Sequence, residues 1–306
     1  MAGQDKTSVV VDGRELTLTN LGKTLYPDDV FAKAEVLDYY QRIAPVLLPH
    51  VAGRPMTLKR YPDGTGGESF FQKHAPDHRP SWVRTERVQE RSSRGRGRGA
   101  TVNYVVIDDL PTLVWAANLA ALELHVPQWR FPRRGEAEPD LLVFDLDPGA
   151  PATIVDCCRV AEALRPLLAA DGFEPLAKTS GGKGLQLYAK VSGITSAKAS
   201  ERAKEYAERL ERDQPGLVVS RMTKSLRKGK ILIDWSQNNG SKTTIAPYSL
   251  RARAHPSVST PVSWEEVESC RDPGDLFFTA PDVLARVEDS GDLFSQLLLS
   301  PGDHQR

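Results

Sequence analysis

Residues 141–148 read Leu141-Leu142-Val143-Phe144-Asp145-Leu146-Asp147-Pro148, and this stretch decides the expected fold. Four apolar residues followed by alternating acids indicate a strand that leaves the core of a sheet. Residues two apart on a strand face the same side, so Asp145 and Asp147 point into one space while Leu146 points into the core. Two carboxylates this close repel each other unless a cation lies between them.

A second apolar run, Ile231-Leu232-Ile233, also ends in an acid, Asp234. If the two strands are neighbours, the three aspartates form a hard-oxygen cluster suited to Mg²⁺ or Mn²⁺. Two divalent ions about 3.5–4 Å apart serve in-line phosphoryl displacement in polymerases and nucleases. The alternative interpretation is a pair of turn-forming aspartates before a proline, and the spacing alone leaves it open.

A glycine-rich loop, Thr179-Ser180-Gly181-Gly182-Lys183-Gly184, lies downstream of these acids. Glycines let backbone N–H groups approach phosphate oxygens, and serine and lysine add donors and charge. The loop is not a Walker A motif, because Ala177 stands where that motif needs its first glycine. A plain hairpin turn remains the alternative. Beyond Asp234, Lys242 and Arg251 are candidates to neutralise a triphosphate, or are ordinary surface charges.

Apolar periodicity predicts mixed helices and strands along the rest of the chain. The expected helices cover residues 33–50, 112–124, 154–170, 197–212 and 282–299. The expected strands cover residues 56–61, 101–107, 141–144, 185–191 and 231–233. We see no internal repeat and no convincing linker, so we expect one α+β domain with two lobes.

The charge of the 306 residues is balanced but unevenly distributed, with 40 Lys and Arg against 40 Asp and Glu. Residues 271–306 hold seven acids and three arginines, so the tail carries −4 and the rest of the chain +4. This balance excludes a strongly basic protein that coats DNA, but it does not exclude a local basic groove. The low-complexity stretch of residues 94–99, Arg-Gly-Arg-Gly-Arg-Gly, indicates either a solvated insertion or an arm that touches phosphates.

Other features favour a cytoplasmic protein. The three cysteines, Cys157, Cys158 and Cys270, suit neither a disulfide framework nor a zinc set. The N-terminus lacks the apolar core of a secretory signal, and no stretch reaches the length of a membrane span. We therefore expect no membrane partner.

Several segments together carry a family resemblance. They are Leu25-Tyr26-Pro27, Gly53-Arg54-Pro55, Glu123-Leu124-His125-Val126-Pro127-Gln128-Trp129, Phe144 to Pro148, Thr179 to Gly184, Asp234-Trp235-Ser236-Gln237-Asn238 and Lys242 to Arg251. In this order they closely resemble the polymerase domain of bacterial LigD and its stand-alone relatives, within the archaeo-eukaryotic primase superfamily. The resemblance runs from about residue 14 to about residue 295.

The resemblance implies a primase-type catalytic core with two mixed or antiparallel sheets flanked by helices and an RRM-like catalytic half. We expect an N-terminal lobe at about residues 1–135 that contacts DNA ends and a catalytic lobe at about residues 136–270. An acidic C-terminal helix is expected at about residues 271–306.

The resemblance also implies an activity: template-directed addition of nucleotides to a primer 3′-hydroxyl at gaps and double-strand breaks, with a preference for ribonucleotides and Mn²⁺. Asp145, Asp147 and Asp234 match the family's metal ligands. We hypothesise that one ion activates the 3′-hydroxyl and the other holds the NTP or dNTP. The matched nucleotide-binding positions are Lys59, His125, Ser180, Gly182, Lys183, Gln186, Lys242 and Arg251. From the sequence alone, His125 would read as a core or capping histidine.

Further matched positions concern DNA. Asn20, Lys23 and Lys33 match the site that holds the 5′-phosphate of a gapped or broken duplex. Phe70 and Phe71 match adjacent aromatics that stack on the template, whereas two core phenylalanines would both be buried. One departure is Gln186, which stands where the family often has histidine, so we expect weaker triphosphate binding or a shifted pH dependence.

Non-homologous end joining with Ku and a separate ligase is the expected pathway, in the bacterial cytoplasm at the nucleoid. Short-gap filling in excision repair and a non-catalytic module that binds DNA ends are the alternatives. A phosphatase of the haloacid-dehalogenase type also ends a strand in Asp-x-Asp, but Gly149 stands where that motif needs Thr or Val.

Overall fold

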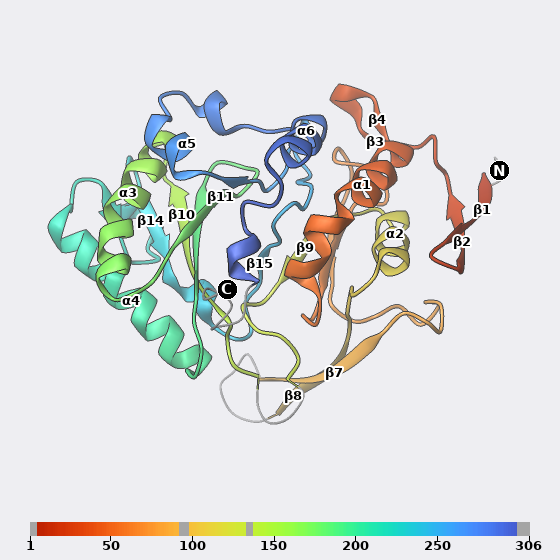
Figure 1. Cartoon of the computed structure of the whole chain (residues 1–306), viewed down its shortest axis with the longest axis horizontal. Coiled ribbons are helices and arrows are strands. Elements are labelled where there is room, and N and C mark those ends of the chain that lie inside the picture. Colours follow the sequence, from red (N-terminus) through yellow and green to blue (C-terminus); the bar gives the residue numbers. More distant parts are fainter. Residues whose placement is uncertain (1–4, 92–97, 133–136, 299–306) are drawn as a thin grey trace.

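Two sheets, each covered by its own helices, form the body of the molecule in the computed structural model (Figure 1). The structure describes residues 5–91, 98–132 and 137–298. Most of the Arg/Gly stretch expected to be an insertion or a phosphate arm therefore lies outside the described residues.

The larger sheet carries the acids. Its six strands follow the order β13-β14-β10-β12-β11-β16, and only the β13–β14 pair is parallel. The strands are β13 (Val218–Val219), β14 (Ile231–Asp234), β10 (Leu141–Pro148), β12 (Leu185–Lys190), β11 (Leu176–Thr179) and β16 (Pro261–Val262).

One face of this sheet packs against helices α3 (Ile154–Ala170), α4 (Ser196–Asp213) and α5 (Trp264–Ser269). Helix α3 begins where the sequence predicts, because the Thr153 hydroxyl and the Asp156 carboxylate cap its first turn reciprocally. Alternate strand residues enter this core, including Phe144, Leu146 and Ile233. The acids between them consequently face away from the helices.

The smaller sheet is antiparallel, in the order β15-β9-β5-β6. Its strands are β15 (Thr244–Ile245), β9 (Ala121–Val126), β5 (Thr57–Arg60) and β6 (Phe70–Gln72). Helices α1 (Lys33–Val51) and α2 (Leu110–Asn118) pack on it and complete a second core. Two buried tyrosines of α1 tie this core to later chain segments, because the Tyr39 hydroxyl donates to the Tyr248 carbonyl and the Tyr40 hydroxyl to the Leu122 carbonyl.

The second half of the chain returns to this first core. Ala246, Leu250 and Val258 are buried in it, as is Val283 of helix α6 (Ala280–Ser290). The two cores are also joined by Arg54, which is 2% exposed and forms a bidentate ion pair with Asp140 at 2.7 and 2.6 Å.

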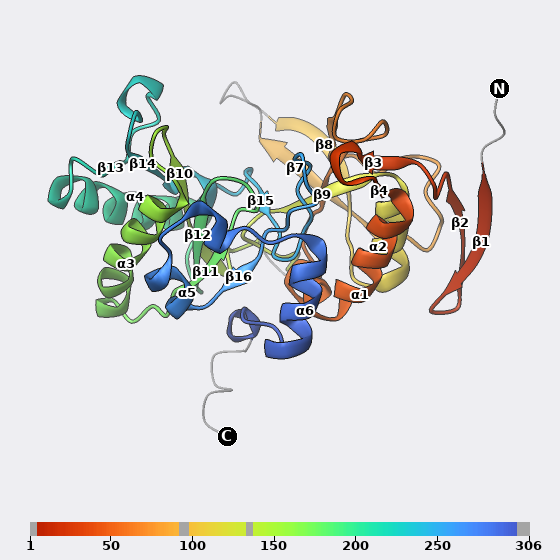
Figure 2. The same cartoon turned by 90° about the horizontal axis from the view of Figure 1, so that it is seen from above.

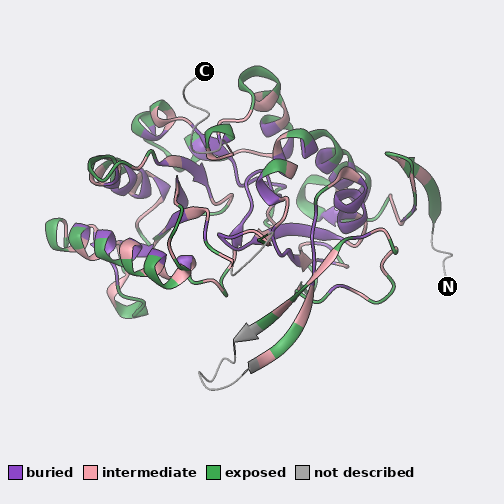
Figure 3. Cartoon of the chain, turned by 60° about the horizontal axis from the view of Figure 1, so that its bottom comes forward, coloured by how far each residue is buried: buried purple, intermediate pink, exposed green. Residues whose placement is uncertain are grey.

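Three two-stranded ribbons lie outside the two sheets. They are β1 (Lys6–Val11) with β2 (Arg14–Thr19), β3 (Thr24–Tyr26) with β4 (Phe31–Ala32), and β7 (Thr85–Arg91) with β8 (Arg98–Val105). Figure 2 shows β1–β2 at one end of the molecule, and Figure 3 shows β7–β8 extending away from the body. Short 3₁₀ turns cover Pro27–Asp29, Lys224–Leu226, Trp235–Asn238, Pro273–Leu276 and Ser295–Leu297.

Two expected helices are wrong in part. The helix predicted for residues 112–124 ends at Asn118, because Ala120 takes a left-handed conformation (φ 56°) and the chain then enters β9. The terminal helix predicted for residues 282–299 ends at Ser290, because Gly291 (φ 69°) stops it. The α+β fold class with two principal sheets is confirmed. Within the described ranges, none of the helices has the length and apolarity that a membrane crossing needs.

Candidate active site

The acidic centre is built by the register of β10 and β14. Asp145 lies directly opposite Asp234, and Asp147 lies opposite Leu232. Opposed residues of an antiparallel pair share a face, so all three carboxylates lie on the face away from α3 and α4. The two acid-ended strands are thus neighbours, which meets the condition on which the predicted cluster depends.

The carboxylates do not converge fully. Asp234 accepts hydrogen bonds on Oδ1 from the Ser236 N–H at 3.0 Å and the Ser236 hydroxyl at 2.5 Å, and on Oδ2 from Gln237 Nε2 at 2.9 Å. These bonds hold its side chain toward the turn that follows β14. Within the described part of the chain, no three His, Cys, Asp or Glu side chains lie close enough together to hold a metal ion.

The electrostatics of the centre nevertheless suit a cation. Burial, and next the charge of Asp147, raise the pKa of Asp145 to about 7. Burial, and next the charge of Asp234, raise the pKa of Asp147. A divalent ion would relieve this repulsion, and carboxylate oxygens are the ligands that Mg²⁺ and Mn²⁺ prefer. The three aspartates therefore fit a divalent ion chemically, provided that Asp234 releases the bonds of its turn.

Gln186 contacts the acidic centre directly and is only 3% exposed. Its Nε2 donates to Asp145 Oδ1 at 3.0 Å, and its Oε1 accepts from Lys178 Nζ at 2.5 Å. The side chain expected to contact a phosphate is therefore engaged with Asp145 and a buried lysine. Lys242, which is exposed, lies 3.9 Å from Asp234 and donates to the Ser236 hydroxyl.

The glycine-rich loop is a tight turn between β11 and β12. The Ser180 hydroxyl accepts from the Gly182 and Gly184 N–H groups at 3.3 and 3.1 Å, so this candidate phosphate ligand caps its own loop. Gly181 has φ 65°, and a Cβ there would lie 2.6 Å from the Arg251 side chain. Lys183 is exposed at the tip. The loop therefore packs directly on Arg251.

The opposite side of the site comes from the smaller sheet. His125 and Glu123 lie two apart on β9, and Lys59 of β5 pairs with Glu123 in the register. Glu123 is 2% exposed; its Oε2 lies 2.9 Å from His125 Nε2, and its Oε1 lies 3.4 Å from Arg251 Nε. Glu123 thus joins two of the predicted nucleotide-binding residues.

These contacts fix the chemistry of His125. Burial alone would raise the pKa of Glu123, but the hydrogen bond from His125 and the charge of Arg251 hold it at about 2. An ionised carboxylate only accepts hydrogen bonds, so His125 Nε2 carries the proton. Burial also lowers the pKa of His125, which favours the neutral ring. Its Nδ1 is then an acceptor, suited to a metal ion or a sugar hydroxyl.

The predicted 5′-phosphate residues come together at the β3–β4 ribbon. The Lys23 N–H donates to the Asn20 carbonyl, and the Lys33 N–H donates to the Lys23 carbonyl. Lys33 is 5% exposed, and its Nζ donates to the Thr19 carbonyl at 2.6 Å. Burial, and next the charges of Lys23 and Arg60, lower the pKa of Lys33 to about 8. A bound anion would offset this repulsion.

Phe70 and Phe71 on the edge strand β6 are both exposed, at 46% and 59%. Neither ring belongs to the core, which excludes the alternative of two core phenylalanines. Phe71 lies edge-on to His125 at 5.5 Å between ring centroids, and Lys59 lies over it. Phe70 lies beneath Arg60 instead. The two rings therefore face opposite sides of the sheet, Phe71 toward the predicted nucleotide-binding residues and Phe70 toward Arg60.

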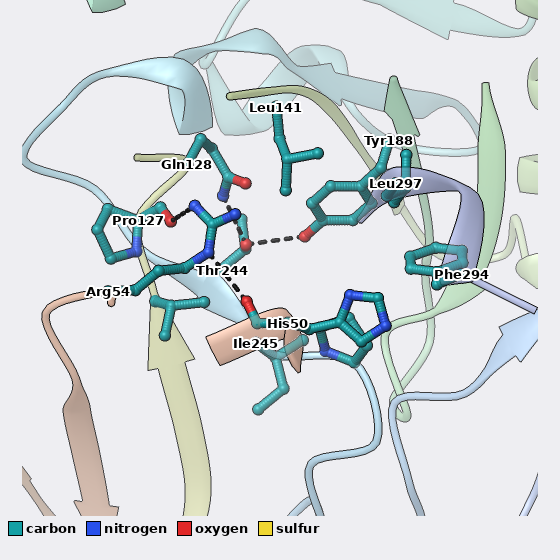
Figure 4. Close-up of a pocket in the computed structure, with 12 residues that line it drawn as sticks. His50, Arg54, Pro127, Gln128, Leu141, Tyr188, Thr244, Ile245, Phe294 and Leu297 are labelled. Atoms are coloured by element: carbon teal, nitrogen blue, oxygen red, sulfur yellow. Dashed lines mark hydrogen bonds between the residues drawn. The ribbon is translucent and has the colours of Figure 1, made fainter. Parts of the chain in front are cut away.

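A small cavity lies behind this site, between the two sheets (Figure 4). It encloses about 20 Å³, which is too small to admit a nucleotide. Gln128, Thr244 and Tyr188 line it and form a hydrogen-bonded row, with Gln128 Nε2 2.7 Å and the Tyr188 hydroxyl 2.8 Å from the Thr244 hydroxyl. The Tyr188 hydroxyl also donates to Gln186 Oε1 at 3.3 Å, so the row reaches the acidic centre.

Three contributors to the site were missed by sequence reasoning. Glu123 was hidden inside a predicted helix, although its spacing of two from His125 is a strand signal. Lys178 could have been noticed as a lysine within an apolar strand directly before the glycine-rich loop. Arg60 carries no local signal, because only the fold brings it near Lys33.

Comparisons with known proteins identify the family of the chain. Residues 32–294 match the family model described as "LigD, primase-polymerase domain". Curated relatives include the multifunctional non-homologous end joining DNA repair protein LigD of Mycobacterium tuberculosis, which is 45% identical over 291 residues, covering 93% of this chain and 37% of that protein. The bifunctional non-homologous end joining protein LigD of Bacillus subtilis is 31% identical over 291 residues, covering 94% of this chain and 45% of that protein.

A solved structure is also similar. It is the polymerase domain from Mycobacterium tuberculosis ligase D in complex with DNA, with a TM-score of 0.85 and 44% sequence identity. The match covers 92% of this chain and 98% of that one. The chain thus spans little more than a third of its full-length mycobacterial relative, but nearly all of the solved domain.

Proposed function

The chain belongs to the LigD primase-polymerase domain family, and from this premise we propose that it is a template-directed nucleotidyltransferase. It adds nucleotides, including ribonucleotides, to primer 3′-hydroxyls at gaps and double-strand breaks, in non-homologous end joining. The observation that carries the proposal is that Arg251 joins the two sheets, because it packs on Gly181 of the loop between β11 and β12 and lies 3.4 Å from Glu123 of β9. The larger sheet presents Asp145, Asp147 and Asp234, and the smaller sheet presents Lys59 and His125, which are expected at a triphosphate.

The acidic centre is the metal site in this proposal. Asp145, Asp147 and Asp234 would hold the divalent ions, Mn²⁺ or Mg²⁺, and His125 Nδ1 is an additional candidate ligand. When bound, such ions supply Lewis acidity to the primer hydroxyl and to the departing pyrophosphate. The protein itself holds the three aspartates on one face of the sheet, on the adjacent strands β10 and β14.

The nucleotide lies between the sheets in this proposal. Lys59, Lys242 and Arg251 neutralise the triphosphate, and the backbone of the loop around Gly182, with Lys183, contacts its phosphates. Glu123 is the positioning residue that orients His125 and Arg251. Because Ser180 and Gln186 already have intramolecular partners, their part is to shape the loop and the acidic centre.

The DNA end contacts the other side of the smaller sheet. Lys23 and Lys33, with Asn20 and Arg60 nearby, form an anion site for the 5′-phosphate across a gap or break. Lys23 must exchange its ion pair with Asp63, which is exposed and therefore weak. The exposed rings of Phe70 and Phe71 stack on the template, which needs no particular base sequence.

Partners and setting follow from the same proposal. Gapped or broken DNA with a 5′-phosphate is the substrate, and Ku and a DNA ligase on a separate chain are the expected protein partners. The bacterial cytoplasm, at the nucleoid, is the proposed location.

Primer extension tests the proposal directly. The protein is incubated with Mn²⁺, labelled ribonucleotides and three DNA substrates: a 5′-phosphorylated gap, a 5′-hydroxyl gap and a blunt end. We expect extension that is fastest on the phosphorylated gap. Binding to these DNAs without extension would support the non-catalytic end-binding alternative, and release of phosphate from p-nitrophenyl phosphate without extension would support the phosphatase; either result overturns the proposal.

A further inference from the structure

Lys178 on β11 is a fully buried lysine held by neutral partners. It is 0% exposed, and its Nζ donates to Gln186 Oε1 at 2.5 Å and to the Ser259 hydroxyl at 2.6 Å. No carboxylate lies within ion-pair distance of it among the described residues. Burying an ammonium group is costly, so a lysine in such a place calls for a reason beyond filling the core.

The contact with Lys178 sets the orientation of the Gln186 amide. The lysine and the Tyr188 hydroxyl both donate to Oε1. The amide can satisfy them only with its oxygen on their side, so its Nε2 is directed at Asp145. The strand register supports this arrangement, since Gln186 lies opposite Lys178 on one side and opposite Asp145 on the other.

The row behind the site reinforces the same orientation (Figure 4). Gln128 Nε2 donates to the Thr244 hydroxyl. If Thr244 donates in turn to Tyr188, then Tyr188 donates to Gln186, and every hydroxyl donates once and accepts once. The last donor of the row is Gln186 Nε2, and its acceptor is Asp145 Oδ1.

We propose that Lys178 and Gln186 are positioning residues that hold the Asp145 carboxylate ready to bind a divalent ion. The inference rests on the proposed function, because it takes Asp145 to be a metal ligand. The hydrogen bond engages Oδ1, so it fixes the carboxylate plane and leaves Oδ2 for the ion. Partners that orient a metal ligand in this way typically contribute about 10- to 100-fold to metal affinity.

Binding of Mn²⁺ to the full chain, without nucleotide or DNA, tests this inference by calorimetry. The variants are Gln186→Leu, Lys178→Met, both together, and Gln186→His. We expect Gln186→Leu and Lys178→Met to weaken binding by about 10- to 100-fold. The double variant should bind Mn²⁺ no more weakly than Gln186→Leu alone, because both changes interrupt the same chain of hydrogen bonds to Asp145. A neutral imidazole in Gln186→His can accept from Lys178 and donate to Asp145, so this variant should retain wild-type affinity.

Controls separate positioning from folding. Lys190→Met makes the same substitution at the far end of β12, opposite Leu141, and should leave Mn²⁺ binding unchanged. If Gln186→Leu alone fails to fold because Lys178 loses an acceptor, the double variant, which buries no amine, carries the test. In extension assays the Mn²⁺ concentration for half-maximal rate should rise in the folded variants, while the KM for nucleotide stays within the range of the control.

The outcomes also separate this inference from the proposed function. Wild-type Mn²⁺ affinity in the double variant, together with loss of binding in Asp145→Ala, overturns the positioning role alone. Equal Mn²⁺ binding by the wild type and Asp145→Ala overturns the metal site itself, and the inference falls with it.

Discussion

Glu123 contacts both His125 and Arg251, two of the residues proposed to bind the nucleotide. One carboxylate oxygen accepts a hydrogen bond from the His125 Nε2–H, and the other faces Arg251 and accepts from the Ala252 N–H at 3.1 Å. Its three neighbours are all donors, so only an ionised carboxylate satisfies them together.

Replacing Glu123 by glutamine should therefore disrupt its contact with either His125 or Arg251, because an amide has only one oxygen to accept hydrogen bonds. An amide that accepts from His125 presents its N–H₂ to Arg251, and the reverse orientation forces the imidazole proton onto Nδ1. We expect the KM for nucleotide to rise about tenfold or more. Imidazole ¹⁵N NMR should detect protonated Nε2 in the wild type and a changed tautomer in Glu123→Gln. Glu288→Gln, on the exposed face of α6, is the control, and an unchanged KM and tautomer in Glu123→Gln would refute the role.

If Lys33 holds the 5′-phosphate as proposed, binding of that phosphate depends on pH. Burial and the neighbouring charges lower its pKa to about 8, so in the free protein it loses its proton as the pH rises through about 8. A 5′-phosphate is a dianion throughout pH 7–9 and favours the charged lysine. Binding above pH 8 therefore requires proton uptake, and affinity falls with rising pH.

We expect the preference for 5′-phosphate over 5′-hydroxyl DNA to fall by up to about tenfold per pH unit above 8, since one proton is taken up. Fluorescence anisotropy on gapped DNA at pH 7, 8 and 9 measures the ratio of the two Kd values. In Lys33→Met the ratio should be smaller and independent of pH. A ratio that stays constant from pH 7 to 9 in the wild type would exclude Lys33 from the phosphate site.

Among the elements, the turn between β11 and β12 is the one most constrained by its surroundings. Gly181 adopts φ 65°, and an added Cβ would lie 2.7 Å from the Val258 carbonyl carbon and 2.8 Å from the Ser259 nitrogen, in addition to Arg251. Gly193 adopts nearly the same φ, 66°, but a Cβ there meets nothing within 4 Å. Substitutions of these two glycines therefore distinguish the cost of backbone strain, which both share, from the cost of crowding, which only Gly181 has.

Gly193→Ala should lower the free energy of unfolding by about 1–2 kcal/mol, the cost of a left-handed alanine. Gly181→Ala adds crowding by backbone atoms, so its loss should be larger, and displacement of Arg251 should raise the KM for nucleotide. Urea unfolding and steady-state kinetics on both variants check this. Equal losses of stability and an unchanged KM would mean that the loop does not position Arg251.

Substitutions in the edge strand β6 should change DNA affinity without changing the stability of the fold. Because Phe70 and Phe71 are exposed, alanine at either position should change the free energy of unfolding by no more than about 0.5 kcal/mol. Loss of a stacked base should weaken template affinity by about 1–3 kcal/mol. Phe277→Ala removes an equally exposed ring outside the two sheets and serves as control. A large loss of stability without loss of DNA affinity would assign the two rings a structural role.

The sequence predicts an element well when the residues that determine it are close together in the chain. Helix α3 is predicted to the residue because its cap and its apolar stripe are local. Strand β9 is missed because residues 112–124 are mostly apolar, and periodicity in such a run does not separate a buried helix from a buried strand. Helix α2 and strand β9 are separated by the left-handed conformation of Ala120, which no side chain in the sequence predicts.

At the scale of the whole molecule, the pairing of β10 with β14 could be hypothesised from two acid-ended apolar strands, and the register confirms it. The contacts of Gln186 and Lys178 could not, because they depend on which strands flank β12. Nor could the position of Arg251, which comes from a late segment that returns to the first core.

The balanced charge is also a property of the whole molecule. The chain has no net charge, yet the fold gathers Lys23, Lys33 and Arg60 at one place and the three aspartates at another. A neutral protein attracts DNA only weakly over long distances, whereas a local cationic site can still bind a phosphate at a DNA end. In the proposed function, the 5′-phosphate then supplies much of the specificity.

The proposed function depends above all on Asp145 and Asp234 as a catalytic metal site for nucleotidyl transfer. The most direct measurement is the rate of single-nucleotide addition to a 5′-phosphorylated gap with Mn²⁺ for the wild type, Asp145→Ala, Asp234→Ala and the exposed control Asp38→Ala. We expect addition by the wild type and Asp38→Ala, and none by the two site variants, with DNA affinity unchanged throughout. Addition at the wild-type rate by Asp145→Ala or Asp234→Ala would contradict it.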